Sequence, residues 1–275
     1  MSERALARRL EAAKEAALLA GQMLLNATAD ELLYQNKAKS DVVTILDTKS
    51  EHLIRDYLHS RFPEDNFLGE EEGLVVYGDG GTWIVDPVDG TNNLVHHIPG
   101  YTVSIAYERE VGCPVLGVVY SPMQDELFSA AEAQGAFLNG DPIACSSTAS
   151  VRDAVTVAPP PLRVPALLEK HFILYSEMCR ESGDLRSFGS ASLNLCYLAM
   201  GRVDAFFEYQ LKYHDYGAAM VIIAESGGCF SSMLPGQTMP YSDILATNKA
   251  LHPWYTQTIM RLVGESDATD QDILQ

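Results

Sequence analysis

One segment of the chain limits the fold more than any other, the run TWIVDPVDGT at residues 82–91. Its first four residues are apolar or β-branched and predict a short buried strand. Pro87 has no backbone N–H to donate to a sheet ladder, so strand pairing is expected to stop there, just after Asp86. The chain must then turn, with Asp89 following closely and Gly90 permitting a sharp or left-handed bend. The segment therefore predicts a strand whose end presents two carboxylates on one tight turn.

Side chains of this turn have the chemistry of a metal and phosphate site. Hard divalent cations prefer oxygen ligands, and Asp86, Asp89 and the carbonyl of Val88 would offer them together. Thr91 stands at the expected start of a short helix, where backbone N–H groups favour an anion such as phosphate. Carboxylates, a hydroxyl and a helix start in one short run favour phosphoryl-transfer chemistry. The same residue types also make an ordinary Asp-Gly turn with a Thr cap, and this segment alone leaves both interpretations open.

The first half of the chain has an α+β pattern. Leu and Ala recur at helical spacing over residues 2–26, which predicts an amphipathic helix. The polar segment 34–41 is expected to be an exposed loop, and a second helix over 42–58 is closed by Pro63. Apolar and β-branched runs then predict a strand at 82–85 and two hairpins, formed by 102–108 with 115–120 and by 126–131 with 135–140.

The second half alternates helices and strands, as an α/β layer structure does. A stretch rich in Ser, Thr and Pro, residues 141–162, separates it from the first half. The expected elements are a helix over 190–200, a strand over 203–209 and a buried helix over 216–226 that Gly227-Gly228 stops. We therefore divide the chain into residues 1–145, residues 146–263 and an acidic tail, 264–275, that is expected to fray.

Net charge narrows the range of functions. The chain has 19 Lys and Arg residues against 37 Asp and Glu, and its formal charge is −18. This balance argues against direct contact with nucleic acid or anionic membranes, because few cations are left to neutralise phosphates. An acidic protein that handles a phosphorylated substrate would need metal cations at its site.

The sequence carries no evident export or membrane signal. Charged residues interrupt the N-terminal segment where a signal peptide has its apolar core, and apolar runs such as 218–224 are too short to span a bilayer. The five cysteines form no CxxC pair, and the seven histidines show no zinc-ligand spacing. A cytoplasmic protein with reduced thiols is therefore expected.

Two further segments carry acidic residues. GEEEG at 69–73 by itself is typical of an exposed acidic loop. HDYG at 214–217 places Asp215 before a strongly apolar helix, where Asp commonly serves as the N-cap. Each of these segments has an ordinary structural explanation when taken alone.

Taken together and in their order along the chain, the three motifs resemble the pattern of a known family. GEE, then DPVDGT, then a late Asp followed by an apolar helix that ends in Gly-Gly resemble the inositol monophosphatase family, part of a superfamily of magnesium-dependent, lithium-sensitive phosphatases. The resemblance runs from about Asp41 to Gly228 and covers most of the chain. It implies a layered αβαβα sandwich of two subdomains with the metal site at their junction. It also implies hydrolysis of a phosphate monoester by a homodimer.

The resemblance assigns roles to particular residues. Two or three Mg²⁺ ions would be held by Glu70, Asp86, Asp89, Asp215 and the carbonyl of Val88. Thr91, paired with Asp47, would polarise the water that attacks phosphorus, and Glu70 would join them in the catalytic set. The backbone N–H groups of Gly90 and Thr91 would hold the phosphate, and Asp89 would also contact the substrate.

Other residues match positions on the substrate side of the family's site. The segment RSFGSAS at 186–192 resembles the turn that lines the substrate, through Gly189, Ser190 and Ala191. Glu208 matches a position that accepts hydrogen bonds from substrate hydroxyls. Lys37 matches a basic residue of a mobile loop near the site, although Lys39 is close enough to blur that assignment.

Three residues depart from the family pattern. His214 stands where the family usually has Trp, Gly217 where it has Ala, and Leu94 where it has an aromatic residue. None would bind metal, so the implied activity stands, and the shape of the substrate near Asp215 is left open. Asn92 and the Asn that follows it resemble the inositol branch, because nucleotide and histidinol branches tend to carry Lys at this position. A small phosphorylated polyol, first of all inositol monophosphate, is the preferred substrate.

Several alternatives stay open at this point. Fructose 1,6-bisphosphate, 3′-phosphoadenosine phosphate, histidinol phosphate and NADP are substrates of other relatives. A role of another class is a non-catalytic one, because some bacterial relatives also act as protein partners in transcription. A metal-binding relative without turnover is the third alternative, and the presence of both Asp47 and Thr91 argues against it.

Overall fold

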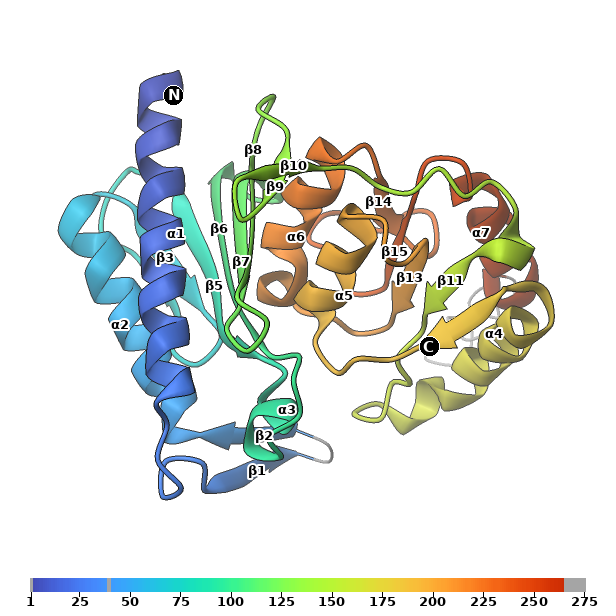
Figure 1. Ribbon diagram of the computed structural model, residues 1–275, viewed down its shortest axis with the longest axis horizontal. Helices are drawn as coiled ribbons and strands as arrows, with labels where there is room; N and C mark the ends of the chain where they lie inside the picture. Colours follow the sequence, from blue (N-terminus) through green and yellow to red (C-terminus); the bar gives the residue numbers. More distant parts are fainter. Residues whose placement is uncertain (1, 39–40, 265–275) are drawn as a thin grey trace, which may run out of the picture.

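The computed structural model describes residues 2–38 and 41–264, with side chains for all of these except residues 37, 38 and 41. Lys39 and the acidic tail from residue 265 onward lie outside the described residues. Figure 1 shows five layers in the order helices, sheet, helices, sheet, helices. The predicted αβαβα sandwich is confirmed.

The larger sheet has eight strands in the order β10-β9-β8-β7-β6-β5-β3-β4. All neighbouring pairs are antiparallel except β3 and β5, which run parallel. Both predicted hairpins are confirmed, as β6–β7 and β8–β9. The bounds are β3 (Asn66–Gly69), β4 (Gly73–Val75), β5 (Thr82–Asp89), β6 (Thr102–Glu110), β7 (Cys113–Ser121), β8 (Glu126–Ala131), β9 (Ala136–Leu138) and β10 (Asp141–Ile143).

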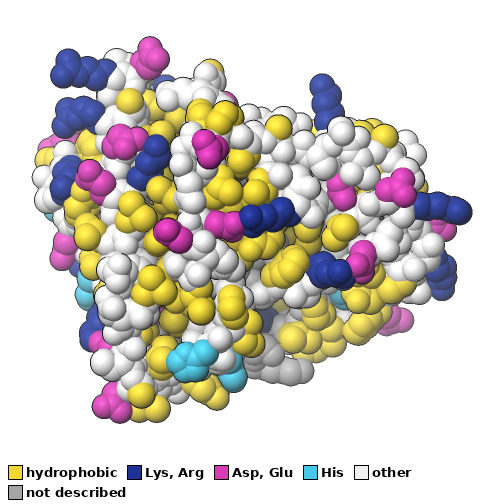
Figure 2. Space-filling view, in the orientation of Figure 1, with side chains coloured by type: hydrophobic (Ala, Val, Ile, Leu, Met, Phe, Trp, Pro, Cys, Tyr) yellow, Lys and Arg dark blue, Asp and Glu magenta, His cyan; other side chains and the backbone are white. Residues whose placement is uncertain are grey.

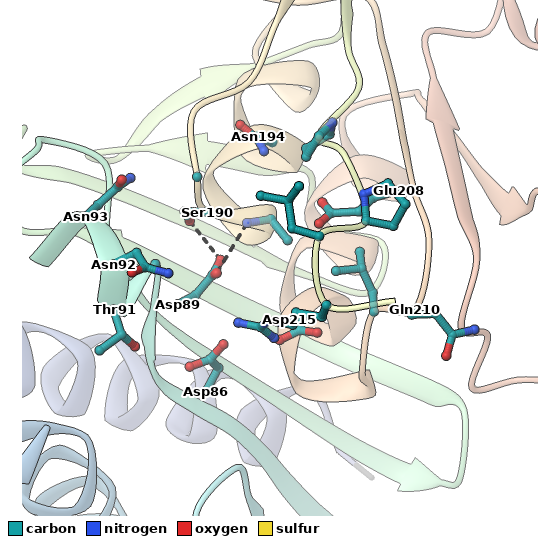
Figure 3. Close-up of a pocket in the computed structure, with 18 of the residues that line it drawn as sticks. Asp86, Asp89, Thr91, Asn92, Asn93, Ser190, Asn194, Glu208, Gln210 and Asp215 are labelled. Carbon is teal, nitrogen blue, oxygen red and sulfur yellow. Dashed lines mark hydrogen bonds between the residues drawn. The ribbon is translucent and has the colours of Figure 1, made fainter. Parts of the chain in front are cut away.

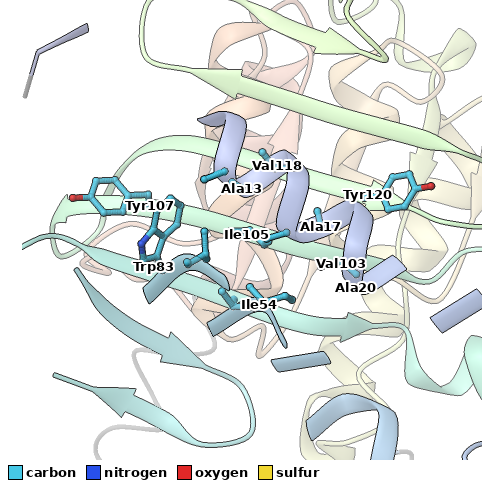
Figure 4. Packing of buried hydrophobic residues seen from close by; sticks show 14 of the residues in the cluster. Ala13, Ala17, Ala20, Ile54, Trp83, Val103, Ile105, Tyr107, Val118 and Tyr120 are labelled. Atoms are coloured by element: carbon cyan, nitrogen blue, oxygen red, sulfur yellow. The ribbon is translucent and has the colours of Figure 1, made fainter. Parts of the chain in front are cut away.

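Helices cover both faces of this sheet, which explains why its central strands are apolar without alternation. On one face lie α1 (Glu3–Leu25) and α2 (Ile45–Arg61), and on the other α5 (Ala191–Ala199) and α6 (Tyr213–Glu225). Small residues let α1 approach the strands closely: Ala13, Ala17 and Ala20 pack against the buried side chains of β6 and β7 (Figure 4). The helix predicted over 2–26 is thereby confirmed.

The smaller sheet has five strands in the order β12-β11-β13-β15-β14. Two more helices form the outermost layer beside it, α4 (Leu168–Glu181) and α7 (His252–Ile259). The strands are β11 (Val155–Val157), β12 (Asp184–Arg186), β13 (Ala205–Glu208), β14 (Cys229–Ser232) and β15 (Ile244–Thr247). The chain passes between the two sheets after β10, within the segment where the sequence predicts the subdomain boundary, and that boundary stays a prediction. Within the described residues, no helix is long and apolar enough to cross a membrane.

The prediction for residues 34–58 is wrong in two respects. The polar segment is a strand, β1 (Tyr34–Ala38), which pairs with β2 (Asp41–Thr44) in an antiparallel ribbon. Tyr34, Gln35 and Asn36 of β1 are all exposed, so this part of the strand lacks the apolar alternation that predicts strands. The following helix begins at Ile45 because Thr44 caps it, its hydroxyl accepting from the backbone N–H of Leu46 at 3.0 Å.

A buried histidine in α4 gives a prediction about stability. The side chain of His171 is fully buried among aromatic rings, including those of Tyr175 and Phe207. Neither ring nitrogen has a hydrogen-bond partner among the described residues. Burial lowers the pKa of His171 to about 4.

Because the unfolded chain binds a proton on this histidine near pH 6.5 and the folded chain does not, stability is lost as pH falls from about 6.5 to about 4. His171→Phe should remove that loss. We expect its free energy of unfolding, relative to the wild type, to rise by about 2.5 kcal/mol between about pH 7.5 and pH 4.5. Urea unfolding of both proteins at the two pH values measures this, and the same difference at both pH values would show that folding does not lower the pKa of His171.

Candidate active site

The end of β5 supplies two buried carboxylates, Asp86 and Asp89. Strand pairing was expected to stop at Pro87, but β5 continues to Asp89. The ladder with β6 is irregular between Asp86 and Asp89 and resumes where Asp89 pairs with Thr102. Pro87 removes one donor and the chain bulges there, and both carboxylates line the same cavity.

The turn after β5 leads straight into a short helix, α3 (Thr91–Val95). Gly90 precedes it with φ of 93°, a left-handed conformation, which is one of the bends that a glycine permits here. A Cβ atom at this position would lie 3.1 Å from the carbonyl oxygens of both Gly100 and Gly189. Gly90 therefore lets the turn approach the segment around residue 189 closely, and it joins the two halves of the site.

Thr91 is hydrogen-bonded to a buried carboxylate of α2. Its hydroxyl oxygen lies 3.0 Å from Oδ1 of Asp47 and 3.0 Å from the carbonyl oxygen of Val88. The other carboxylate oxygen of Asp47 accepts from the backbone N–H of Thr44 at 2.8 Å and from its hydroxyl at 2.7 Å. Burial raises the pKa of Asp47, and these donors oppose that shift. The cap of α2 thus fixes Asp47, and Asp47 fixes the hydroxyl of Thr91.

Asp215 lies in the first turn of α6. This helix begins at Tyr213, earlier than predicted, so Asp215 is not the N-cap; instead it accepts from the backbone N–H of Lys212 at 2.6 Å. Burial and the neighbouring charges of Asp89 and Glu70 raise the pKa of Asp215 to about 7. Burial raises the pKa of Asp86 too, with Glu70, Asp89 and Asp215 adding to the shift.

These groups surround one cavity of about 240 Å³ between the two sheets. Figure 3 shows Asp86, Asp89 and Thr91 on one side, with Glu208 and Asp215 facing them from the other. Of the predicted site residues, those that line the cavity are Glu70, Asp86, Val88, Asp89, Gly90, Thr91, Gly189, Ser190, Ala191, Glu208 and Asp215.

Some predicted residues are not part of the lining. Asp47 lies behind Thr91, to which it is hydrogen-bonded. Lys37 lies in β1, but its side chain is outside the described residues. The three residues that depart from the family pattern are also absent from the lining, and His214 is a neighbour of Asp215, with Nε2 lying 3.6 Å from the Asp215 carboxylate.

Sequence reasoning missed several residues of this site. The segment 159–164, which contains the triple proline, forms part of the wall, and its Arg163 is the one basic residue among the described lining residues. Glu51 is buried in α2 and accepts from the backbone N–H groups of Glu71 and Glu72, each at 2.9 Å, which supports the turn that carries Glu70. The prolines belong to the stretch 141–162 that the sequence marks as a separator, but no local pattern indicates that they reach the cavity.

The donor set fits a hard divalent cation. Five carboxylates and one arginine line the described part of the cavity, and all the candidate metal ligands are oxygen atoms. Burial raises the pKa values of Asp86, Asp89 and Asp215, and neighbouring carboxylates add to the shift at Asp86 and Asp215. Bound cations would offset this cost of burying negative charge. Within the described residues, no three acidic, histidine or cysteine side chains already lie close enough together to hold a metal ion.

Comparison with known proteins agrees with this geometry. The sequence model of the inositol monophosphatase family matches residues 5–263. The chain belongs to the inositol monophosphatase family. This is a family of phosphatases that are generally Mg²⁺-dependent, in keeping with the acidic cavity.

Individual relatives cover nearly the whole chain. A "Fructose-1,6-bisphosphatase/inositol-1-monophosphatase" from Aquifex aeolicus is 33% identical over 250 residues, which are 90% of this chain and 94% of the relative. A "Nus factor SuhB" from Escherichia coli K12 is 33% identical over 243 residues, covering 87% of this chain and 91% of the relative. The crystal structure of the extragenic suppressor protein suhB from Bartonella henselae has a TM-score of 0.85 and 31% identity, covering 92% of this chain and 98% of that one.

Proposed function

We propose that this chain is a Mg²⁺-dependent phosphatase that hydrolyses a small phosphorylated polyol, most readily inositol monophosphate. The observation that carries the proposal is the convergence of the Thr91–Asp47 pair and an acidic oxygen cluster on one cavity. A phosphatase of this type needs both parts, because phosphate must be held among carboxylates and a water must be aligned to attack it.

The metal ligands would be Glu70, Asp86, Asp89, Asp215 and the carbonyl of Val88, holding two or three ions. When bound, Mg²⁺ supplies charge neutralisation for the phosphate and lowers the pKa of a coordinated water. Asp47 holds the hydroxyl of Thr91, whose oxygen can then accept a hydrogen bond from the attacking water and orient it. The backbone N–H groups of Gly90 and Thr91 would bind the phosphate oxygens.

The other side of the cavity would recognise the rest of the substrate. Glu208, Gln210 and Asn194 line it together with the turn at 189–191. Carboxylate and amide groups suit the hydroxyls of a polyol, which both donate and accept hydrogen bonds. Burial raises the pKa of Glu208, as it does that of Asp215, and the charge of Arg163 opposes the shift in both. A homodimer and a cytoplasmic location stay predictions from the sequence, as does a contribution from Lys37.

A panel of phosphate esters tests the choice of substrate. We expect kcat/KM with Mg²⁺ to be highest for inositol 1-phosphate among the candidates and the activity to fall with Li⁺. The other members of the panel are fructose 1,6-bisphosphate, 3′-phosphoadenosine phosphate, histidinol phosphate and NADP. A higher kcat/KM for any of these four would assign the site to that substrate instead.

Glu208 gives a sharper prediction about recognition. Glu208→Gln keeps the size of the side chain but replaces one carboxyl oxygen with an amide group that only donates, so we expect KM for inositol 1-phosphate to rise about tenfold with kcat changed less than about threefold. For p-nitrophenyl phosphate, which has no polyol hydroxyls, KM should stay the same. An unchanged KM for inositol 1-phosphate would contradict the role of Glu208.

A second candidate function belongs to another class. The Escherichia coli relative carries the name Nus factor, which favours a protein-partner role in transcription beside or instead of catalysis. This protein-partner role does not include direct binding of nucleic acid, because the formal charge of the chain is −18. Figure 2 also shows Lys and Arg side chains dispersed over the visible face, with acidic side chains among them. Rescue of a deletion phenotype by the inactive variant Asp86→Asn would support it, and failure of that rescue would argue for catalysis alone.

A further inference from the structure

The two carboxylate oxygens of Asp89 have different surroundings. Oδ2 accepts three hydrogen bonds: from the hydroxyl of Ser190 at 2.7 Å, and from the backbone N–H and the hydroxyl of Ser192 at 2.7 and 2.6 Å. Oδ1 accepts one longer bond from the described residues, from the N–H of Ala191 at 3.3 Å. The contact between Ser190 and Asp89 is drawn in Figure 3. Oδ2 is therefore saturated with donors, and Oδ1 keeps capacity for a further partner.

A second hydroxyl lies behind Ser192. The Thr102 hydroxyl oxygen is 2.6 Å from that of Ser192 and 3.3 Å from that of Ser190. Ser192 has one hydroxyl hydrogen, and the ionised carboxylate of Asp89 can only accept, so Ser192 donates to Asp89 and Thr102 donates to Ser192. The relay therefore runs from Thr102 through Ser192 to Asp89, and both hydroxyl residues are fully buried.

The fold brings this relay together from two distant segments. Thr102 is the residue that pairs with Asp89 where the β5–β6 ladder resumes after Pro87. Ser192 is in the first turn of α5, which Ser190 caps by accepting from the N–H of Leu193. The irregularity in the ladder thus determines which hydroxyl supports the carboxylate.

We infer that Ser192, supported by Thr102, is a positioning residue that anchors Oδ2 of Asp89 and reserves Oδ1 for the cation. The inference rests on the proposed function, because it assigns the remaining oxygen to Mg²⁺. Groups that hydrogen-bond a metal ligand fix its orientation, and removing one typically weakens metal binding by about 10- to 100-fold. Hydrogen bonds in a buried relay also strengthen each other, so Thr102 contributes through Ser192.

Calorimetric titration with Mg²⁺, in the absence of any substrate, tests this directly. Ser192→Ala should raise the Mg²⁺ dissociation constant about tenfold, and Thr102→Val should raise it about threefold. Thr102→Ser, which keeps the hydroxyl, should bind as the wild type does. The double variant should be no weaker than Ser192→Ala alone, because Thr102 acts through Ser192.

Two distant hydroxyls provide matched controls. Thr156 is buried and hydrogen-bonded to the hydroxyl of Tyr255 at 2.6 Å in the smaller sheet, and Ser226 donates to the carbonyl of Ile223 at the end of α6. Thr156→Val and Ser226→Ala should lower stability in EDTA and leave the Mg²⁺ dissociation constant unchanged.

Each outcome has one meaning. Mg²⁺ binding by Ser192→Ala and Thr102→Val within about twofold of the wild type would overturn the inference while leaving the proposed function in place. A wild-type protein that binds no Mg²⁺ would refute the proposed function, and the inference with it. If Ser192→Ala failed to fold, the Mg²⁺ dissociation constants of Thr102→Val and Thr102→Ser would still test the inference.

Discussion

Asp86→Asn should make the protein more stable in EDTA and at the same time abolish its response to Mg²⁺. Asp86 is fully buried, and the charges of Glu70, Asp89 and Asp215 add to the effect of burial in raising its pKa. A pKa that is higher in the folded state means that stability is lost as pH rises through that pKa. The amide of Asn cannot ionise, so the variant does not lose stability as the pH rises. We therefore expect its free energy of unfolding near neutral pH in EDTA to exceed that of the wild type by about 1–2 kcal/mol. That difference should disappear below about pH 4, where the carboxyl is protonated in both states.

The same substitution should remove a metal ligand. We expect the rise in melting temperature that Mg²⁺ gives the wild type to vanish in Asp86→Asn, and phosphate release to fall at least about 10³-fold. Asp204→Asn is the matched control: this carboxylate is also buried, but it accepts from the N–H of Val155 at 2.7 Å and is not part of the cavity lining. It should lower stability and keep the Mg²⁺ response. Destabilisation of Asp86→Asn in EDTA, or a retained Mg²⁺ response, would contradict the assignment of Asp86.

Thr91→Val should separate catalysis from metal binding. The substitution removes the hydroxyl that Asp47 holds and keeps the shape of the side chain. Loss of an aligned proton acceptor for water costs about 10²–10⁴ in rate, so kcat should fall within that range. The Mg²⁺ dissociation constant, measured by calorimetry, should change less than about threefold, because the carbonyl of Val88 and the carboxylate ligands remain.

Thr91→Ser provides the control for this prediction. It keeps the hydroxyl within reach of Asp47, so its kcat should lie within about tenfold of the wild type. A kcat for Thr91→Val as high as that of Thr91→Ser would show that some other group orients the water. Equal loss of Mg²⁺ binding and rate in Thr91→Val would instead mean that the residue acts mainly on the metal site.

The sequence predicts the part of this site that is local in the chain. Asp86, Pro87, Asp89 and Gly90 adjoin one another, and each constrains the backbone or supplies an oxygen, so a strand ending in an acidic turn follows from them. The same holds for the long amphipathic helix α1 and for the two hairpins, whose apolar patterns are continuous. The order of the three acidic motifs then indicates the family.

Other features depend on contacts between distant segments, which no local pattern records. Thr102 and Ser192 are 90 positions apart and meet only because the ladder resumes at Asp89. Arg163 reaches the cavity from a connecting segment that has no helix or strand pattern. The sequence of β1 is polar, so no apolar pattern predicts that it pairs with β2. The sequence predicts that α6 begins at residue 216, because the apolar run begins after Asp215, but the helix begins at Tyr213.

The central claim is that the acidic cavity hydrolyses a phosphate monoester with Mg²⁺, and release of inorganic phosphate from inositol 1-phosphate tests it most directly. The assay compares the wild type with Mg²⁺, with EDTA and with added Li⁺, alongside Asp86→Asn. We predict turnover that requires Mg²⁺, falls with Li⁺ and is absent in Asp86→Asn. Phosphate release that persists in EDTA or in Asp86→Asn would contradict the account, as would the absence of release from every ester of the panel with Mg²⁺ present.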